Sequence, residues 1–379
     1  MSEPTKPRVA IVFGGRSNEH AISCITAGSV LAAIDHEVYD VVPVGIAPDG
    51  RWVLETNTGR LRIGAGGELP AVDSGRPGVQ LAQGRSGSSE LVVIDSSDSA
   101  PDPLGGQLGA IDVVFPLLHG PWGEDGTLQG LLEMAGVRYV GAGVLASAVG
   151  MDKHFMKVVL RSAGLPVLPH VLITPRGWVD DPEACRESVR ALGFPVFVKP
   201  CRGGSSVGIS KVHDESELDA AVEEARLHDP KVLVEAFAGA DAREIECGVL
   251  DGLDGAAAEV SVVAEIHVDG DHEFYDFAAK YLPGEAARLQ IPADLDDALS
   301  EEIRAIALQA FIAIGCEGLA RADFFVQHDG RVVVNELNTM PGFTPTSMFP
   351  RVWAASGVDY PELVDRLIRL AMAREAGLR

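Results

Sequence analysis

Oxygen-bearing side chains and one arginine gather near the end of the chain, at a spacing that could hold a metal ion. Asp323 follows Arg321 by two residues, and Glu336 and Asn338 repeat that spacing after an intervening turn. Side chains on a strand alternate between its faces, so each pair shares one face of its own strand. Two carboxylates and an amide are therefore expected to converge beside an arginine.

This set of donors favours Mg²⁺ over zinc, because hard oxygen ligands suit Mg²⁺. Two buried carboxylates repel each other unless a cation or hydrogen bonds neutralise them, and proteins usually hold Mg²⁺ with a few carboxylates plus substrate phosphates. The alternative is a surface hairpin in which Arg321 simply pairs with Asp323 or Glu336. Phosphate ligands elsewhere in the chain would favour the metal.

A candidate phosphate loop lies upstream. The apolar segment 194–200 ends in Lys199 and Pro200, and a glycine- and serine-rich stretch containing Ser205 and Ser206 follows at once. Glycines let backbone N–H groups approach an anion, and serines and the lysine add donors. The Walker A pattern is absent. Lys153 begins an expected helix, whose N-terminus would reinforce its attraction for phosphate, although an isolated lysine there could equally be a solvated one.

The elements that must position these residues can be read from periodicity and turn signals. Residues 319–326 and 331–334 predict a hairpin around the turn 328–330. An apolar stripe in 294–315 predicts a helix packed beneath that hairpin. Residues 231–237 read as another strand running into a loop, where an adenine edge could meet the backbone, and residues 9–13 read as a buried parallel strand.

Several of these segments, taken in order, resemble the ATP-grasp superfamily and, within it, the D-alanine:D-alanine ligase family. The resemblance covers nearly the whole chain. It implies an α/β fold with α+β elements: a three-domain ATP-grasp architecture with an N-terminal Rossmann-like parallel-sheet domain and two domains that clasp ATP. The segments that carry it are His119 to Gly130, Val198 to Pro200, Gly204 to Gly208, Ala279 to Tyr281, and the set Arg321, Asp323, Glu336, Asn338, Pro341 and Gly342.

The resemblance also implies how the cofactors bind. Asp323, Glu336 and Asn338 would hold two Mg²⁺ ions, for which Mn²⁺ can substitute. The residues expected to bind ATP are Lys153, Lys199 and Lys280 with Ser205 and Ser206 at the phosphates, Glu235, Ala236 and Phe237 at adenine, and Glu244 at ribose. For Glu244 the alternative is a surface residue in the charged run 241–244.

The same resemblance places the amino acid substrates. Glu19 would meet the ammonium group of the first D-alanine, and His119 would help to hold that substrate. From the residues alone, Glu19 could be a helix-entry residue favoured by the helix dipole, and His119 could be an N-cap or core histidine. Many family members have a second acid where Ala21 stands here, so a role for such an acid is in doubt.

The second D-alanine would be met by other segments. Ser347 and Met348 would receive its carboxylate, although ordinary loop capping is the alternative for Ser347. Tyr281, in a mobile lid, would bond Ser205 and through it Glu19. This tyrosine favours an amine over D-lactate as the second substrate; core packing is its alternative role.

The implied chemistry explains these residue types. ATP converts the first carboxylate into an acyl phosphate, and Mg²⁺ and lysines offset the charge of the transferred group. The second amine then attacks and builds an oxyanion, for which Arg321 and the backbone N–H of Gly342 are the expected donors.

Composition agrees with such an enzyme. The 379 residues are 46% hydrophobic, and 55 acidic against 31 basic residues give a net charge of -24, which disfavours nucleic acid and anionic membranes as partners. No apolar run approaches a membrane span, and no signal peptide is evident, so a cytoplasmic protein is expected. The five scattered cysteines predict reduced thiols.

We expect three domains: residues 1–149, with a loop-rich insertion at 56–109, residues 150–240 with the phosphate loop, and residues 241–379 with the Mg²⁺ site and lid. The resemblance implies a homodimer acting on D-alanine and ATP. Two alternatives remain open. One is another ATP-grasp carboxylate-amine ligase or a D-alanine:D-lactate ligase; the other is a nucleotide-binding regulator without catalysis, which should lack a metal ligand or Arg321.

Overall fold

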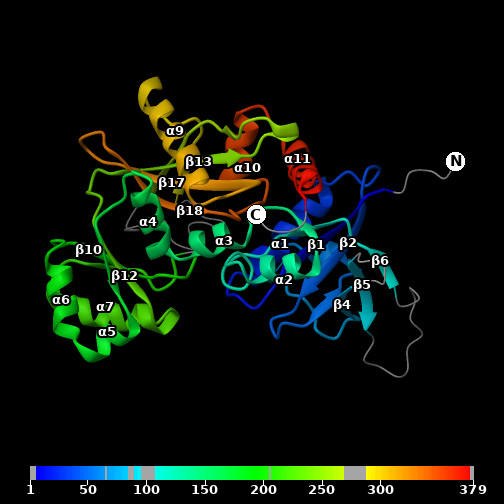
Figure 1. Ribbon diagram of the computed structural model, residues 1–379, viewed down its shortest axis with the longest axis horizontal. Helices are drawn as coiled ribbons and strands as arrows, with labels where there is room; N and C mark the ends of the chain where they lie inside the picture. Colours follow the sequence, from blue (N-terminus) through cyan, green and yellow to red (C-terminus); the bar gives the residue numbers. More distant parts are fainter. Residues whose placement is uncertain are drawn as a thin grey trace.

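Three β-sheets organise the protein (Figure 1). The computed structural model describes residues 6–64, 66–83, 89–94, 107–204, 206–268 and 287–375. In Figure 1 the first sheet is blue to cyan, the second is green, and the third is yellow-green to orange.

The first sheet has eight strands in the order β6-β5-β4-β3-β2-β1-β7-β8. Its parallel part contains β1 (Arg8–Gly14), β2 (Asp40–Ile46), β7 (Val113–Pro116) and β8 (Arg138–Tyr139). Antiparallel pairing adds β3 (Trp52–Leu54), β4 (Gly78–Gln83), β5 (Ser89–Ile94) and β6 (Gln107–Ala110). The predicted strand at 9–13 is confirmed, and its side chains are almost fully buried, as its unbroken apolar run indicates.

The helices of this part are α1 (His20–Ala33), η1 (Thr58–Arg60), α2 (Thr127–Ala135) and α3 (Val144–Met151). The described part of the expected insertion at 56–109 contains more regular structure than a loop-rich segment suggests. Its strands β4 and β5 lengthen the first sheet. Val79 and Leu91 are buried on one face of these strands, which anchors the strands to the core.

The second sheet is antiparallel, in the order β11-β10-β12-β9. It consists of β9 (His170–Ile173), β10 (Val196–Pro200), β11 (Ser210–Val212) and β12 (Val232–Ala236), and its helices are α5 (Pro175–Asp180), α6 (Pro182–Arg190) and α7 (Glu215–His228). The preceding helix α4 (Lys153–Ser162) packs Met156 and Leu160 into the core cluster of the third sheet. Val196 and Val198 pack in one core cluster with residues of α7. Because side chains alternate along a strand, Phe197 and Lys199 point the other way.

The third sheet has the order β16-β15-β13-β17-β18, and β14 pairs with β13. Its strands are β13 (Arg243–Leu250), β14 (Glu259–Val260), β15 (Ala264–Val268), β16 (Ala287–Gln290), β17 (Leu319–Val326) and β18 (Val332–Asn338). The predicted hairpin is confirmed as the antiparallel pair β17 and β18, and its second strand runs on to Asn338. A turn of 3₁₀ helix, η2 (Leu253–Gly255), follows β13.

Helix α9 (Asp297–Ala313) packs beneath that hairpin, as its apolar stripe predicts, and buries Ile303, Ala307, Ala310 and Phe311. The last helices, α10 (Met348–Ala355) and α11 (Tyr360–Ala373), share their core cluster with β1 and β7. Segments from the two ends of the chain therefore stabilise each other. Within the described residues, no helix combines the length and the apolar character needed to cross a membrane.

Two helical glycines test the packing of the first sheet. A Cβ atom on Gly28 of α1 would overlap the carbonyl oxygen of Leu61, whereas one on Gly130 of α2 would meet nothing within 4 Å. We expect Gly28→Ala to lower the free energy of unfolding by about 1–3 kcal/mol through overpacking. We expect Gly130→Ala to raise it by up to about 1 kcal/mol through helix propensity. Urea unfolding of both variants checks this; equal effects would contradict the close approach of α1 to residue 61.

Candidate functional site

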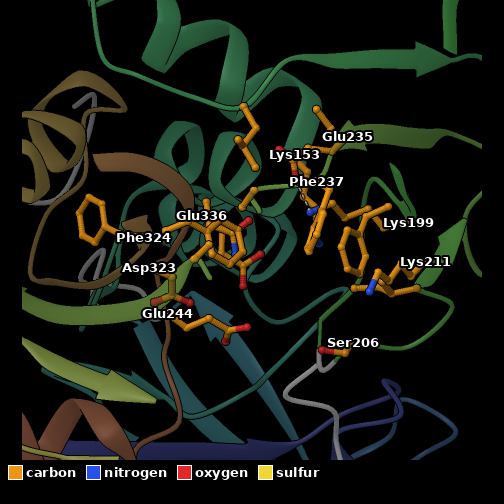
Figure 2. A pocket seen from close by; sticks show the side chains of 18 of the residues that line it. Lys153, Lys199, Ser206, Lys211, Glu235, Phe237, Glu244, Asp323, Phe324 and Glu336 are labelled. Atoms are coloured by element: carbon orange, nitrogen blue, oxygen red, sulfur yellow. Dashed lines mark ion pairs between the residues drawn. The ribbon is translucent and has the colours of Figure 1, made fainter. Parts of the chain in front are cut away.

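A cavity of about 380 Å³ lies between the second and third sheets (Figure 2). It gathers every predicted ATP-binding residue that the structure describes, namely Lys153, Lys199, Ser206, Glu235, Ala236, Phe237 and Glu244. Two of the predicted metal ligands, Asp323 and Glu336, line it as well. Ser205 and Lys280 lie outside the described residues.

The two walls of this cavity carry opposite charge. Figure 2 shows Lys199 and Lys211, from β10 and β11, across the cavity from Glu244 and Asp323 of the third sheet. Lys211, which the sequence reasoning missed, holds its ammonium 5.0 Å from the centre of the Phe237 ring. A polyanion accompanied by metal cations fits such a pair of walls, because its phosphates face lysines while the metals face carboxylates.

A buried carboxylate between two lysines anchors the cationic wall. Glu235 is 2.5 Å from the Nζ atoms of both Lys157 and Lys199, and Lys157 also donates to the carbonyl oxygen of Asn335 at 2.9 Å. Burial by itself would raise the pKa of Glu235, but the two lysines outweigh it and lower that pKa to about 2. Burial lowers the pKa of Lys157, against the opposing pull of Glu235. Two lysines and one carboxylate together carry one excess positive charge, which suits a phosphate.

Lys157 is therefore a site residue that the sequence reasoning did not find. It is fully buried on α4, one turn beyond Lys153 and close to the apolar Met156 and Leu160. Lysines are almost never buried without a partner. A lysine within the apolar side of an amphipathic helix was thus an available signal.

The predicted cluster on the hairpin forms, with three carboxylates level across three strands. Glu246 of β13 stands opposite Asp323 of β17, which stands opposite Glu336 of β18. Arg321 donates to both oxygens of Asp323, at 2.7 and 2.6 Å, and lies 2.9 Å from Glu246. Burial would lower the pKa of Arg321, but Asp323 and Glu246 outweigh it and raise that pKa. Arg321 thus pairs with Asp323, as the surface-hairpin alternative expected, but the hairpin is not a surface one, because the side chain of Arg321 is only 14% exposed.

The donor set of this cluster fits Mg²⁺. Asp323, Glu336 and Asn338 offer hard oxygen atoms beside a cavity with lysines, as a phosphate-linked Mg²⁺ requires. The described residues contain no group of three or more His, Cys, Asp and Glu arranged to hold a metal by themselves. Asn338 donates its Nδ2 to Asp323 at 3.0 Å, so its amide must turn to present its oxygen. Substrate phosphates would therefore have to complete the coordination.

A second, smaller cavity of about 70 Å³ gathers the residues predicted to hold the first amino acid and the oxyanion. Glu19, His119, Arg321 and Gly342 all line it, as does Asn338. Lys153, Gly203, Gly204 and Glu336 line both cavities. The two cavities are therefore neighbours, and groups bound in each could react with one another.

Two glycines give Glu19 its place in the small cavity. Gly120 has a φ of +75°, and a Cβ atom there would lie 2.7 Å from Oε2 of Glu19. A Cβ atom on Gly204, in the phosphate loop, would lie 3.2 Å from the same oxygen. The backbones of two separate loops thus approach the carboxylate of Glu19 closely. At position 120 only glycine permits this approach.

His119 is held on both sides by the protein. Its Nδ1 lies 3.2 Å from the carbonyl oxygen of Met340, and its Nε2 lies 3.5 Å from the hydroxyl of Thr26. Burial lowers the pKa of His119, although Glu19 opposes this, so the ring is neutral at pH 7. A neutral ring donates from Nδ1 to the carbonyl and leaves Nε2 as an acceptor. His119 thereby links the first sheet to the loop that precedes Gly342.

The ligands expected for the second amino acid are not brought into the small cavity. Ser347 and Met348 do not line it. Ser347 instead accepts the backbone N–H of Thr344 at 3.2 Å, which is the loop-capping alternative, and Met348 belongs to a core cluster. Tyr281 lies outside the described residues.

These features define a class. An antiparallel sheet with a lysine-rooted glycine loop faces a second antiparallel sheet with acidic residues across a nucleotide-sized cavity, which is the ATP-grasp arrangement. Residues 8–142 match the family model described as D-ala D-ala ligase N-terminus, and residues 159–369 match D-ala D-ala ligase C-terminus. The chain belongs to the D-alanine:D-alanine ligase family.

Individual relatives agree. The chain is 56% identical to the D-alanine--D-alanine ligase of Pseudarthrobacter chlorophenolicus, over 99% of this chain and 96% of the relative. The solved D-alanine-D-alanine ligase from Coxiella burnetii matches with a TM-score of 0.78 at 33% identity, covering 98% of this chain and 95% of that chain. The VanG D-Ala:D-Ser ligase from Enterococcus faecalis matches with a TM-score of 0.80 at 34% identity, covering 97% of this chain and 100% of that chain.

The buried Glu235 makes a pH-dependent contribution to stability. Its pKa is lowered from 4.5 to about 2 in the folded protein, so its ionised form stabilises the fold above about pH 4.5, and this contribution is lost as the pH falls towards 2. We expect Glu235→Gln to lower the free energy of unfolding by about 3 kcal/mol at pH 7, with a smaller loss at pH 3.5. Urea unfolding at several pH values measures this.

The matched control is Glu224→Gln, which removes an exposed carboxylate from α7 that lies 3.6 Å from His228. We expect this variant to change stability by less than about 1 kcal/mol at every pH. A cost of Glu235→Gln that does not change with pH would contradict the ionised buried group.

Proposed function

We propose that this protein uses ATP to join two D-alanine molecules into D-alanyl-D-alanine, through an acyl phosphate, for peptidoglycan precursor synthesis. The observation that carries the proposal is the contact between the two cavities. The nucleotide-sized cavity and the cavity with Glu19 and Arg321 share Lys153 and Glu336 as lining residues. A γ-phosphate in one can therefore meet a carboxylate in the other.

In the first step, a carboxylate oxygen of the first D-alanine attacks the γ-phosphorus, and the bond to ADP breaks. Lys153 and Lys199 bind the phosphates, and Lys280, Ser205 and Ser206 assist them. Glu235, Ala236 and Phe237 place the adenine, and Glu244 holds the ribose. Positioning and charge stabilisation supply most of the catalysis in such transfers. Glu19 and His119 hold the first D-alanine in line.

Asp323, Glu336 and Asn338 hold two Mg²⁺ ions in this proposal, and Mn²⁺ can substitute. When bound, the ions neutralise charge on the transferred phosphate. The donor set supports this assignment. The row of neighbouring carboxylates supports it as well, because a bound cation would offset their mutual repulsion.

In the second step, the amine of the second D-alanine attacks the acyl carbon, loses a proton and expels phosphate. Arg321 and the backbone N–H of Gly342 stabilise the oxyanion. Ser347 and Met348 bind the second carboxylate after the segment rearranges. Tyr281, through Ser205 and Glu19, links the lid to the first substrate and excludes water from the acyl phosphate.

A second candidate is ligation of D-alanine to a different acceptor. It is supported by the likeness of this chain to the VanG D-Ala:D-Ser ligase, which matches the chain about as well as the D-alanine-D-alanine ligase from Coxiella burnetii does. D-lactate is a further acceptor to be tested. A non-catalytic regulator is disfavoured, since Arg321, Asp323, Glu336 and Asn338 are all present.

The proposed setting is a cytoplasmic homodimer with no nucleic acid or membrane partner. The family and the strongly acidic composition support it. We also propose three domains with boundaries near residues 150 and 240, since the second sheet begins after the first of these points and the third begins after the second.

Arg321→Ala tests the oxyanion donor. With ATP, Mg²⁺ and D-alanine, we expect the wild type to release phosphate and form a dipeptide, and the variant to lose about 100-fold to 1000-fold in rate. Phosphate release and mass analysis of the products measure both. The control is Arg331→Ala in the turn of the same hairpin, where the arginine is 71% exposed and pairs with Asp329, and we expect it to remain active.

Other outcomes change the account. Phosphate release only with D-serine or D-lactate as the acceptor would replace the second substrate. Nucleotide binding without turnover under all these conditions would favour the regulator.

A further inference from the structure

A second carboxylate, that of Glu124, lies in the amino acid cavity. Glu124 lines this cavity with Glu19 and belongs to the turn that leads from His119 into α2. It accepts the backbone N–H of Gly120 at 2.6 Å. Among the described residues, no lysine, arginine or histidine forms an ion pair with Glu124. Lys153 attracts the Glu124 carboxyl without forming an ion pair with it.

The two carboxylates repel each other in this cavity. Burial, and then the charge of Glu19, raise the pKa of Glu124 to about 8, whereas the Gly120 N–H and Lys153 act in the opposite direction. Without a bound cation Glu124 is therefore largely protonated at pH 7, and a cation held between the two acids favours its ionised form. Glu336 adds a further repulsion. Carboxylates that repel one another in a low-dielectric site create a place for a cation.

We propose that Glu124 and Glu19 together bind the ammonium group of the amino acid whose carboxylate is activated. Glu124 thereby becomes a specificity-determining residue that favours an amino acid over a hydroxy acid at the first position. This inference rests on the proposed function, because it names a further ligand for the first substrate.

The geometry supports an ammonium ion over other cations. Glu19 and Glu124 stand on the same cavity as Lys153 and Arg321, so a substrate there meets both signs of charge. A zwitterion satisfies both, with its carboxylate towards the cations and its ammonium towards the two acids. Ala21, two residues beyond Glu19, supplies no charge. The second acid of the pair is Glu124, which comes from a different loop.

A purely positional role would look different. Glu124 could serve only to fix Gly120 in its left-handed conformation next to Glu19. Glutamine at this position can still accept the Gly120 N–H but carries no charge. Glu124→Gln therefore separates the two roles, and Glu124→Ala removes both.

The experiment compares Glu124→Gln with the matched control Asp125→Asn. Asp125 accepts the N–H groups of Trp122 and Thr127 and does not line the cavity. Two-substrate kinetics gives separate KM values for the first D-alanine, the second D-alanine and ATP. Inhibition by D-lactate, competing with the first D-alanine, reports a ligand of similar shape without the ammonium. Thermal unfolding shows that each variant is folded.

We expect Glu124→Gln to raise the KM for the first D-alanine by about 10-fold to 100-fold, the loss of one charged hydrogen-bond partner. The KM for ATP and the inhibition constant of D-lactate should stay close to those of the wild type. Asp125→Asn should leave all of these constants unchanged.

Three results would overturn the inference. An unchanged Glu124→Gln with an impaired Glu124→Ala would assign a positional role. An equal loss of D-lactate and D-alanine binding by Glu124→Gln would show that the charge of Glu124 does not act through the ammonium group. If the wild type itself forms no dipeptide, the proposed function fails, whereas an active wild type with an unaffected Glu124→Gln rejects the inference alone.

Discussion

The structure depends on keeping unlike charges buried on facing sheets. The second sheet and α4 carry Lys157 and Lys199 around one carboxylate, and the third sheet carries a level row of carboxylates around one arginine. Neither wall is stable as an array of isolated charges, since burying a lone charge costs on the order of several kcal/mol. Each wall therefore holds one internal counterion and leaves its remaining charge for a ligand.

This arrangement connects the fold to the chemistry. On the cationic wall the counterion Glu235 also contacts Lys199, and on the acidic wall the counterion Arg321, held by Asp323, is itself the expected oxyanion donor. The smaller cavity likewise combines both signs of charge, because Glu19 and Glu124 line it together with Lys153 and Arg321. Shared lining residues join the two cavities, so a phosphate and a carboxylate can be brought together while the glycine loop stays close to Glu19.

Local patterns in the sequence predict much of this arrangement. Strand alternation places Arg321, Asp323, Glu336 and Asn338 on one surface, and the turn residues predict their hairpin. What the sequence does not reveal depends on contacts between distant segments. Lys157 meets Glu235, Glu246 meets Arg321, and Glu124 nears Glu19 only through packing or strand register that no local period encodes. The strands at 78–83 and 89–94 are also difficult to predict from the sequence, because turn-forming residues flank them on both sides.

The affinity for ATP with and without Mg²⁺, in wild type and in two variants, tests the two-wall account most directly. Isothermal titration should show that Mg²⁺ strengthens ATP binding by the wild type and that Asp323→Asn loses this enhancement while retaining the Mg²⁺-free affinity. Lys199→Met should weaken binding under both conditions. If Asp323→Asn kept the full Mg²⁺ enhancement, or if Lys199→Met bound ATP like the wild type, the division of the site into a metal-facing and a phosphate-facing wall would be contradicted.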